Sequence, residues 1–234
     1  MLMNIKLQQG VFSCIADESL IFLDSNEMKY FQLDIKKTQL LLDYCKNTED
    51  RENFDKKTIK LLNSLEENSL LRFVDDLDTV INRESFFSKK IAKPEDSIYS
   101  LTFFNRDKLN FKDFLIALSV NIYVRFKFKF FYNPMKINRG KTIFFNDFDQ
   151  QKLIKIIGLY NSALVFTPWR GVNKCLLKSM ALKYFLNLNG YNADLIIGVR
   201  ANPFFAHAWL QIDNVVLNDN IDKVGDYQPI MRIR

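Results

Sequence analysis

The sequence predicts an α+β fold built from two parts. In the first part, short apolar runs separated by polar turns precede amphipathic segments, which is the pattern of a small antiparallel sheet followed by helices. In the last part, a helical pattern precedes apolar runs that alternate with turns. The chain has 234 residues, of which 48% are hydrophobic, so it is long enough for one large domain or two small ones.

The N-terminal part is expected to hold three strands and then two helices. Asp34 is a suitable N-cap for the first helix. A small sheet followed by helices is typical of a winged-helix-like module. A DNA-binding winged helix would carry Lys and Arg on its helical half, but acidic residues crowd that half here. The expected strands are residues 11–15, 20–23 and 28–33, the expected helices are 38–45 and 57–68, and an apolar stretch follows at 70–74.

The two parts are separated by a charged, irregular stretch at residues 75–96, which contains Pro94. We therefore expect a first domain at residues 1–80, a linker at 81–100 and a second domain at 101–234.

Two helices are expected ahead of the C-terminal motifs, at residues 110–132 and 148–164. Two interpretations of the first stay open: a core helix of the second domain, or a helix that lies at a membrane surface through its Phe and Lys residues. The stretch R-G-K-T at 139–142 resembles the end of a phosphate-binding loop, but Met135 stands where the other glycine belongs. No nucleotide site is assigned.

The C-terminal part places one thiol and one imidazole on separate elements. Asn173 is a suitable N-cap and Gly190 a suitable stop for a helix, so Cys175 falls in its first turn. There the backbone N–H groups and the helix dipole favour the thiolate. His207, the only histidine in the chain, lies in a predicted strand, and Asp219 follows twelve residues later. Together they are the parts of a nucleophilic catalytic site.

Both residue types also have a structural explanation. A free cysteine is a common buried apolar residue, and a lone histidine in a strand is more often structural than catalytic. The joint occurrence of Cys175, His207 and a nearby carboxylate favours the catalytic interpretation.

Four motifs follow one another in this region. C-L-L-K-S-M-A-L begins at Cys175, L-I-I-G-V-R at Leu195, P-F-F-A-H-A-W-L at Pro203 and L-N-D at Leu217. Together they resemble the transglutaminase-like cysteine peptidases of lasso-peptide biosynthesis, the B proteins. The resemblance implies a papain/transglutaminase-like second domain and a leader-recognition first domain.

The resemblance also implies an activity. The family removes the leader from a ribosomally made lasso-peptide precursor, and a separate asparagine-synthetase-like cyclase then closes the macrolactam at the exposed N-terminus of the core. Carried over by motif, Cys175 is the nucleophile, His207 the general base and acid, and Asp219 the group that orients the histidine. ATP dependence has been proposed within the family, but we expect no cofactor here.

In such proteins the leader is expected to add as a strand to a sheet edge and to lie along a neighbouring helix. A proline at Phe31 should weaken leader binding if the N–H of that residue faces the leader. Cys175 N–H is the expected oxyanion donor, with Trp169 or Asn173 as the second. The expected leader-binding residues are Met28, Lys29, Tyr30, Phe31, Gln32 and Leu33 on the strand and Lys57 and Leu61 on the helix.

The choice between Asn218 and Asp219 as the partner of His207 depends on one turn. Strands are expected at residues 194–200 and 205–212, with a turn at 213–214 leading into 215–217. A two-residue turn would put Asn218 on the His207 side, whereas a three-residue loop or a bulge would put Asp219 there. Since the family pattern favours Asp219, we predict the loop or the bulge.

Two other functions use the same residues: an acyltransferase in which an amine replaces water, and a non-catalytic escort of the precursor. Residues 121–142 hold six Lys or Arg and no Asp or Glu, for which an acidic leader or a protein is a better counterpart than nucleic acid.

The composition predicts the cellular compartment of the protein. No apolar run is long enough to span a membrane, and the first residues lack a secretory core. Three scattered cysteines and one histidine favour neither a disulfide framework nor a zinc site. A reducing cytoplasm is expected.

Overall fold

The computed structural model describes residues 4–46, 55–74, 91, 93–104, 111–131, 149–164 and 174–234. They form two compact units. The first consists of Met1–Lys90 with Val199–Phe205 and Gln228–Met231, and the second of Ile91–Gly198, Ala206–Tyr227 and Arg232–Arg234. The α+β class expected from the sequence is confirmed, whereas the two segments that join the first unit from the C-terminal part were not anticipated.

A three-stranded antiparallel sheet opens the first unit, in the order β2-β3-β4. Its strands are Val11–Ala16, Ser19–Asp24 and Lys29–Gln32, close to the ranges predicted from the sequence. Asp17 and Glu18, in the first turn, and Met28, in the second, have positive φ angles.

A second, two-stranded sheet in this unit was not expected. β1 (Asn4–Leu7) pairs antiparallel with β5 (Leu71–Val74), which the sequence indicated only as an apolar stretch. The two strands are far apart in the chain and only four residues long, so no local pattern marks their pairing.

The described residues of the first unit also form two helices, α1 (Ile35–Lys46) and α2 (Lys56–Glu67). The carboxylate of Asp34 accepts the N–H of Lys37 at 2.8 Å, and Asp55 caps α2 in the same way through Thr58. α1 packs against β3, and α2 against α1 and β5, around one core that includes Phe22, Leu41, Leu62 and Leu71. Identification of this unit as a winged-helix-like leader-recognition domain stays a prediction.

A five-stranded sheet in the order β10-β7-β8-β9-β6 supports the candidate site. The strands at Asp194–Arg200 (β7) and Phe205–Ile212 (β8) are those predicted, and β10 is Gln228–Ile233. β9 (Val215–Val216) pairs parallel with β6 (Asp96–Ser97), so part of the stretch expected as a linker belongs to this sheet.

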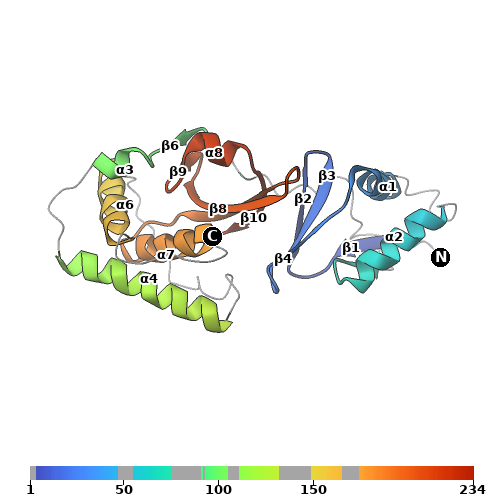
Figure 1. Ribbon diagram of the computed structural model, residues 1–234, viewed down its shortest axis with the longest axis horizontal. Helices are drawn as coiled ribbons and strands as arrows, with labels where there is room; N and C mark the ends of the chain where they lie inside the picture. The colour runs from blue at the N-terminus through green and yellow to red at the C-terminus, as the bar shows by residue number, and fades with distance from the viewer. Residues whose placement is uncertain are drawn as a thin grey trace. The chain divides into compact units, whose positions relative to one another are not determined.

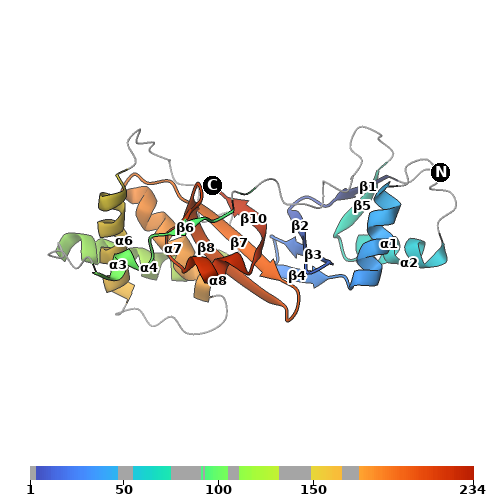
Figure 2. The ribbon, with the colours of Figure 1, turned by 90° about the horizontal axis from the view of Figure 1, so that it is seen from above.

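Helices form a layer on this sheet. α7 (Lys174–Leu188) lies between the sheet and α4 (Phe111–Phe131) (Figures 1 and 2). α6 (Gln150–Leu164) packs against α4 and α7. α4 buries Ala117, Val120 and Val124, so one face of this helix belongs to the core, as the first of the two interpretations expects. The described residues also form two short helices: α3 (Leu101–Phe104), which packs on α6, and α8 (Ile221–Gly225), which follows the bend at residues 217–219 and precedes β10.

Within the described part of the chain, no helix is long and apolar enough to cross a membrane. The same residues contain no group of three His, Cys, Asp or Glu side chains placed to hold a metal ion. Cys14, Cys45 and Cys175 are all free thiols.

Candidate active site

Cys175 occupies the first turn of α7, as the sequence predicts. The helix begins at Lys174 and ends at Leu188, and Gly190 follows with a φ of +85°, the left-handed conformation that glycine adopts most easily after a helix. Leu176, Met180 and other apolar side chains of α7 are buried, which fixes the rotation of the helix. Cys175 itself is only half-buried and reaches an open cleft. The expected N-cap, Asn173, lies outside the described residues.

His207, in β8, meets both Cys175 and Asp219. His207 Nε2 lies 2.5 Å from Asp219 Oδ2, and only 8% of the histidine side chain and 16% of the aspartate side chain are exposed. His207 also acts on Cys175, since it lowers the pKa of that thiol. Since Nε2 faces the carboxylate, Nδ1 is the nitrogen left for the thiol. The structure thus brings together the three residues that the sequence singled out.

The electrostatics of the three groups favour an ion pair. Burial alone would raise the pKa of Cys175, but the hydrogen bond and charge of His207 and the N–H groups of Ala208 and Leu176 outweigh it and lower that pKa. Burial would likewise lower the pKa of His207, but its bonds to Asp219 and Cys175 raise it. Against the effect of burial, His207, Asn220 and Lys223 lower the pKa of Asp219. Thiolate, imidazolium and carboxylate are therefore mutually stabilised.

Asp219 is held from several sides. Its Oδ1 accepts the N–H of Asn220 at 2.9 Å, and its carbonyl accepts the hydroxyl of Ser97, on β6, at 2.6 Å. Lys223 Nζ donates to Oδ2 at 3.1 Å from the next turn, in α8. These bonds fix the carboxylate in one orientation toward His207.

The prediction of a three-residue loop or a bulge before Asp219 is wrong. Gln211 pairs with Val216 and Ile212 with Val215, so the turn at Asp213-Asn214 has two residues and β9 contains no extra residue. Asp219 reaches His207 for a different reason: β9 ends at Val216, and the chain bends through residues 217–219. Strand alternation therefore no longer decides which side chain faces the imidazole.

Asn218 has a separate position in the structure. Its Oδ1 accepts the N–H of Leu210 at 2.7 Å, and its Nδ2 donates to Ser179 Oγ at 2.8 Å. Ser179 Oγ in turn donates to the carbonyl of Ala208 at 3.0 Å. Asn218 and Ser179 thus link α7, which carries Cys175, to β8, which carries His207.

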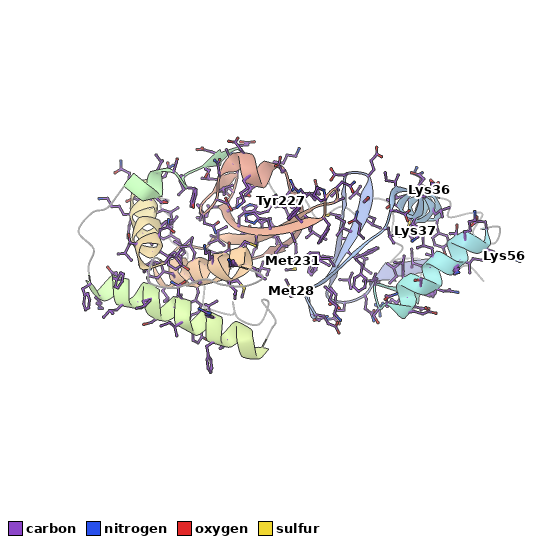
Figure 3. The ribbon with its side chains drawn as sticks, in the orientation of Figure 1. Met28, Lys36, Lys37, Lys56, Tyr227 and Met231 are labelled. Carbon is purple, nitrogen blue, oxygen red and sulfur yellow. The ribbon has the colours of Figure 1, made fainter. Side chains whose placement is uncertain are left out.

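Two aromatic rings pack against the ring of His207. The ring of Tyr227 lies 5.3 Å from that of His207, and the ring of Trp209 lies 6.2 Å away and nearly parallel (Tyr227 is labelled in Figure 3). Gly198 makes this packing possible, because a Cβ atom there would lie 2.7 Å from the Trp209 ring. This contact explains the glycine in the L-I-I-G-V-R motif.

The three residues line a cleft of about 480 Å³. Tyr99 and Asn161 contribute to its wall, and exposed lysines, Lys174 and Lys178, lie on its rim. Sequence reasoning missed Ser179, Asn218 as a link, Lys223 and Tyr227. The signal that was available is spacing: Ser179 is one helical turn after Cys175, and Lys223 is four residues after Asp219 on a helix that Asn220 begins.

The expected leader-binding residues lie on two separate elements of the first unit. Met28 precedes β4, an edge strand that contains Lys29–Gln32, and Leu33 follows it (Met28 is labelled in Figure 3). On α2, Lys57 is exposed and Leu61 is half-buried against the core. The helix packed on the three-stranded sheet is α1 rather than α2.

The register of β4 corrects the expectation for Phe31. Leu33 N–H donates to the carbonyl of Leu20 at 2.8 Å, and in an antiparallel pair the N–H groups alternate in direction. The N–H of Phe31 therefore points to β3, whereas those of Tyr30 and Gln32 point to the outer edge. The two candidates for the second oxyanion donor, Trp169 and Asn173, lie outside the described residues.

Comparison with known proteins agrees with this geometry. Residues 147–232, which include Cys175, His207 and Asp219, match the model of the transglutaminase-like superfamily. Over 142 residues the chain is 30% identical to the microcin J25-processing protein McjB of Escherichia coli. The chain resembles the lasso-peptide B proteins. The aligned region covers 61% of this chain and 63% of McjB, so the chain spans less than two thirds of that relative. No solved structure matches the chain significantly.

Proposed function

We propose that this protein is a cysteine peptidase that binds and removes the leader of a lasso-peptide precursor. The observation that carries the proposal is the arrangement of Cys175, His207 and Asp219 in an open cleft, with the pKa of the thiol lowered and that of the imidazole raised. A thiolate beside an imidazolium is a ready nucleophile with its own proton donor. The similarity to a protein named for processing microcin J25 supports a peptide precursor as substrate.

The proposed reaction has two halves. The thiolate of Cys175 attacks the scissile carbonyl carbon, and the peptide bond breaks as His207 gives its proton to the leaving amine. The amine belongs to the core peptide, and the leader stays bound as a thioester. His207 then takes a proton from water, the water oxygen attacks the thioester, and the leader leaves with a new carboxylate. Asp219 keeps the imidazole in the required orientation throughout.

The N–H of Cys175 is the proposed oxyanion donor. It belongs to the first turn of α7, where the backbone N–H groups have no partner within the helix. Donors of this kind stabilise the negative oxygen of the tetrahedral intermediate more than the ground-state carbonyl. The freed core amine would pass to an asparagine-synthetase-like cyclase, which we propose as the partner in the cytoplasm. No step of this mechanism uses ATP.

Product masses test the proposal. The precursor is to be sought as a short reading frame beside the gene of this protein. Its incubation with the protein is expected to give two peptides whose masses sum to that of the precursor plus one water. A leader fragment whose mass equals that of the hydrolysis product plus an amine minus one water would instead establish the acyltransferase. Two results together would favour the escort. The precursor would stay intact when it is incubated with the protein, and, in a separate experiment, a thiol-directed electrophile would label no cysteine.

Leader recognition is proposed to occur at the outer edge of β4. A leader strand added there would use the main-chain groups of Tyr30 and Gln32, and side chains at alternate positions would give selectivity. In a Cys175→Ala background, Gln32→Pro is expected to weaken leader binding about three- to tenfold, because one edge N–H is lost. Titration calorimetry with a synthetic leader measures this.

The matched control for that experiment is Gln32→Ala, which removes the side chain but keeps the N–H group. It should bind the leader with the affinity of the parent. Equal affinity for the alanine and proline variants would place the leader elsewhere, for example along Lys57 and Leu61 of α2.

A further inference from the structure

α4 has two apolar faces. One face packs into the second unit through Ala117, Val120 and Val124. On the other side, four large apolar side chains are exposed, and at 100° per residue they fall within a sector of about 60°. This outer stripe consists of Phe111 (72% exposed), Leu115 (43%), Ile122 (60%) and Phe126 (61%).

The outer stripe continues into a shallow apolar groove between α4 and α7. Tyr123 of α4 and Tyr184 and Leu188 of α7 line the groove together with Phe111 and Leu115. Single exposed apolar residues are common on proteins, but a contiguous apolar surface of this kind marks an interaction site.

The helix that carries the stripe is basic. α4 contains four Lys or Arg and one acidic residue, Asp113. Lys112 and Arg125 are exposed next to the stripe, and Lys127 Nζ lies 5.3 Å from the centre of the Tyr123 ring. Long basic side chains can lie along apolar surface with their charges at its border.

We propose that the outer stripe of α4 binds the surface of an anionic lipid bilayer, with α4 parallel to the membrane plane. One face of α4 is buried in the protein, and on its other face large exposed apolar side chains flanked by cationic ones can be buried at the boundary of headgroups and acyl chains. The exposed basic residues of α4 supply the attraction to anionic headgroups.

The charge distribution favours a bilayer over two other partners, a second copy of the chain and a nucleic acid. A second copy of the chain meeting the first through the same face would bring two sets of basic residues together, which repel. A nucleic acid would satisfy the charges but would leave the four apolar side chains against a phosphate backbone. A bilayer with anionic lipids matches both the apolar stripe and the positive charge.

Sedimentation with vesicles tests the proposal on the full chain. The protein is expected to bind vesicles made of equal parts phosphatidylglycerol and phosphatidylcholine, to bind pure phosphatidylcholine vesicles much less, and to be released as salt is raised. Ile122→Ser combined with Phe126→Ser should weaken binding at least about tenfold. Lys112→Gln with Arg125→Gln should do so by a similar factor, since each basic residue near the surface contributes about fivefold.

The matched control removes two equally exposed isoleucines from the first unit, Ile35→Ser with Ile59→Ser, and should bind vesicles like the parent. Circular dichroism checks that every variant is folded, and the charge variant retains the apolar stripe should the serine variant fail that check.

The proposal is overturned if the parent does not bind anionic vesicles, or if the folded stripe and charge variants bind as well as the control. Light scattering that shows a dimer of the parent, a monomer of the stripe variant and no vesicle binding would assign the face to a second copy. These readouts do not involve Cys175, so the peptidase proposal stands or falls separately.

Discussion

Replacing Cys175 with alanine is expected to lower leader release to roughly a thousandth or less of the parent rate, because the attacking sulfur is lost and no other group can form the thioester. Leader affinity should stay nearly unchanged, since recognition is assigned to β4 in the first unit. Mass spectrometry of the precursor after incubation measures release, and calorimetry with the leader measures affinity.

The other two cysteines provide the control. Cys14 is fully buried and Cys45 nearly so, and burial raises the pKa of Cys14 to about 12, which leaves no thiolate at neutral pH. A thiol-directed electrophile should therefore label Cys175 first and stop cleavage in proportion. Cys14→Ala and Cys45→Ala should cleave normally when folded. Substantial cleavage by the Cys175→Ala variant would remove this residue from the mechanism.

The sequence predicted what depends on local pattern. Short apolar runs bounded by polar turns located β2, β3, β7 and β8, and helical spacing located α2, α6 and α7. The position of Cys175 in the first turn of α7 follows from this helical spacing together with Gly190. The local surroundings of Cys175 were therefore predictable.

What the sequence did not predict depends on distant or very short segments. The pairs β1–β5 and β6–β9 join strands of two to four residues across long stretches of chain. The register before Asp219 was predicted from strand alternation, which no longer applies once the chain bends after Val216. Lys223 was overlooked because α8 has only five residues, too few for a periodic pattern.

The coupled charges of the site also set an expected pH profile. Cleavage should fall at low pH as the thiolate of Cys175 is protonated, and this limb should lie below the ordinary thiol pKa because that pKa is lowered. It should fall at high pH as the imidazolium of His207 loses its proton, and this limb should lie above the ordinary histidine pKa because that pKa is raised. The bond from Asp219 contributes to the second shift, so a variant without the carboxylate should lose activity at a lower alkaline pH than the parent.

Asp219→Ala is expected to slow cleavage roughly a hundredfold to ten-thousandfold, whereas Asn218→Ala should slow it by no more than about tenfold. The first change frees the imidazole to turn and moves the alkaline limb to lower pH. The second removes the bonds to Leu210 and Ser179, which tie α7 to β8, so its main effect should be a loss of roughly 1–3 kcal/mol of unfolding free energy. Single-turnover cleavage across pH, with thermal unfolding of each variant, separates the two roles. If Asn218→Ala abolished cleavage in a stable protein while Asp219→Ala kept the parent's rate and alkaline limb, the orienting group would be the carboxamide, and this would be a Cys-His-Asn site.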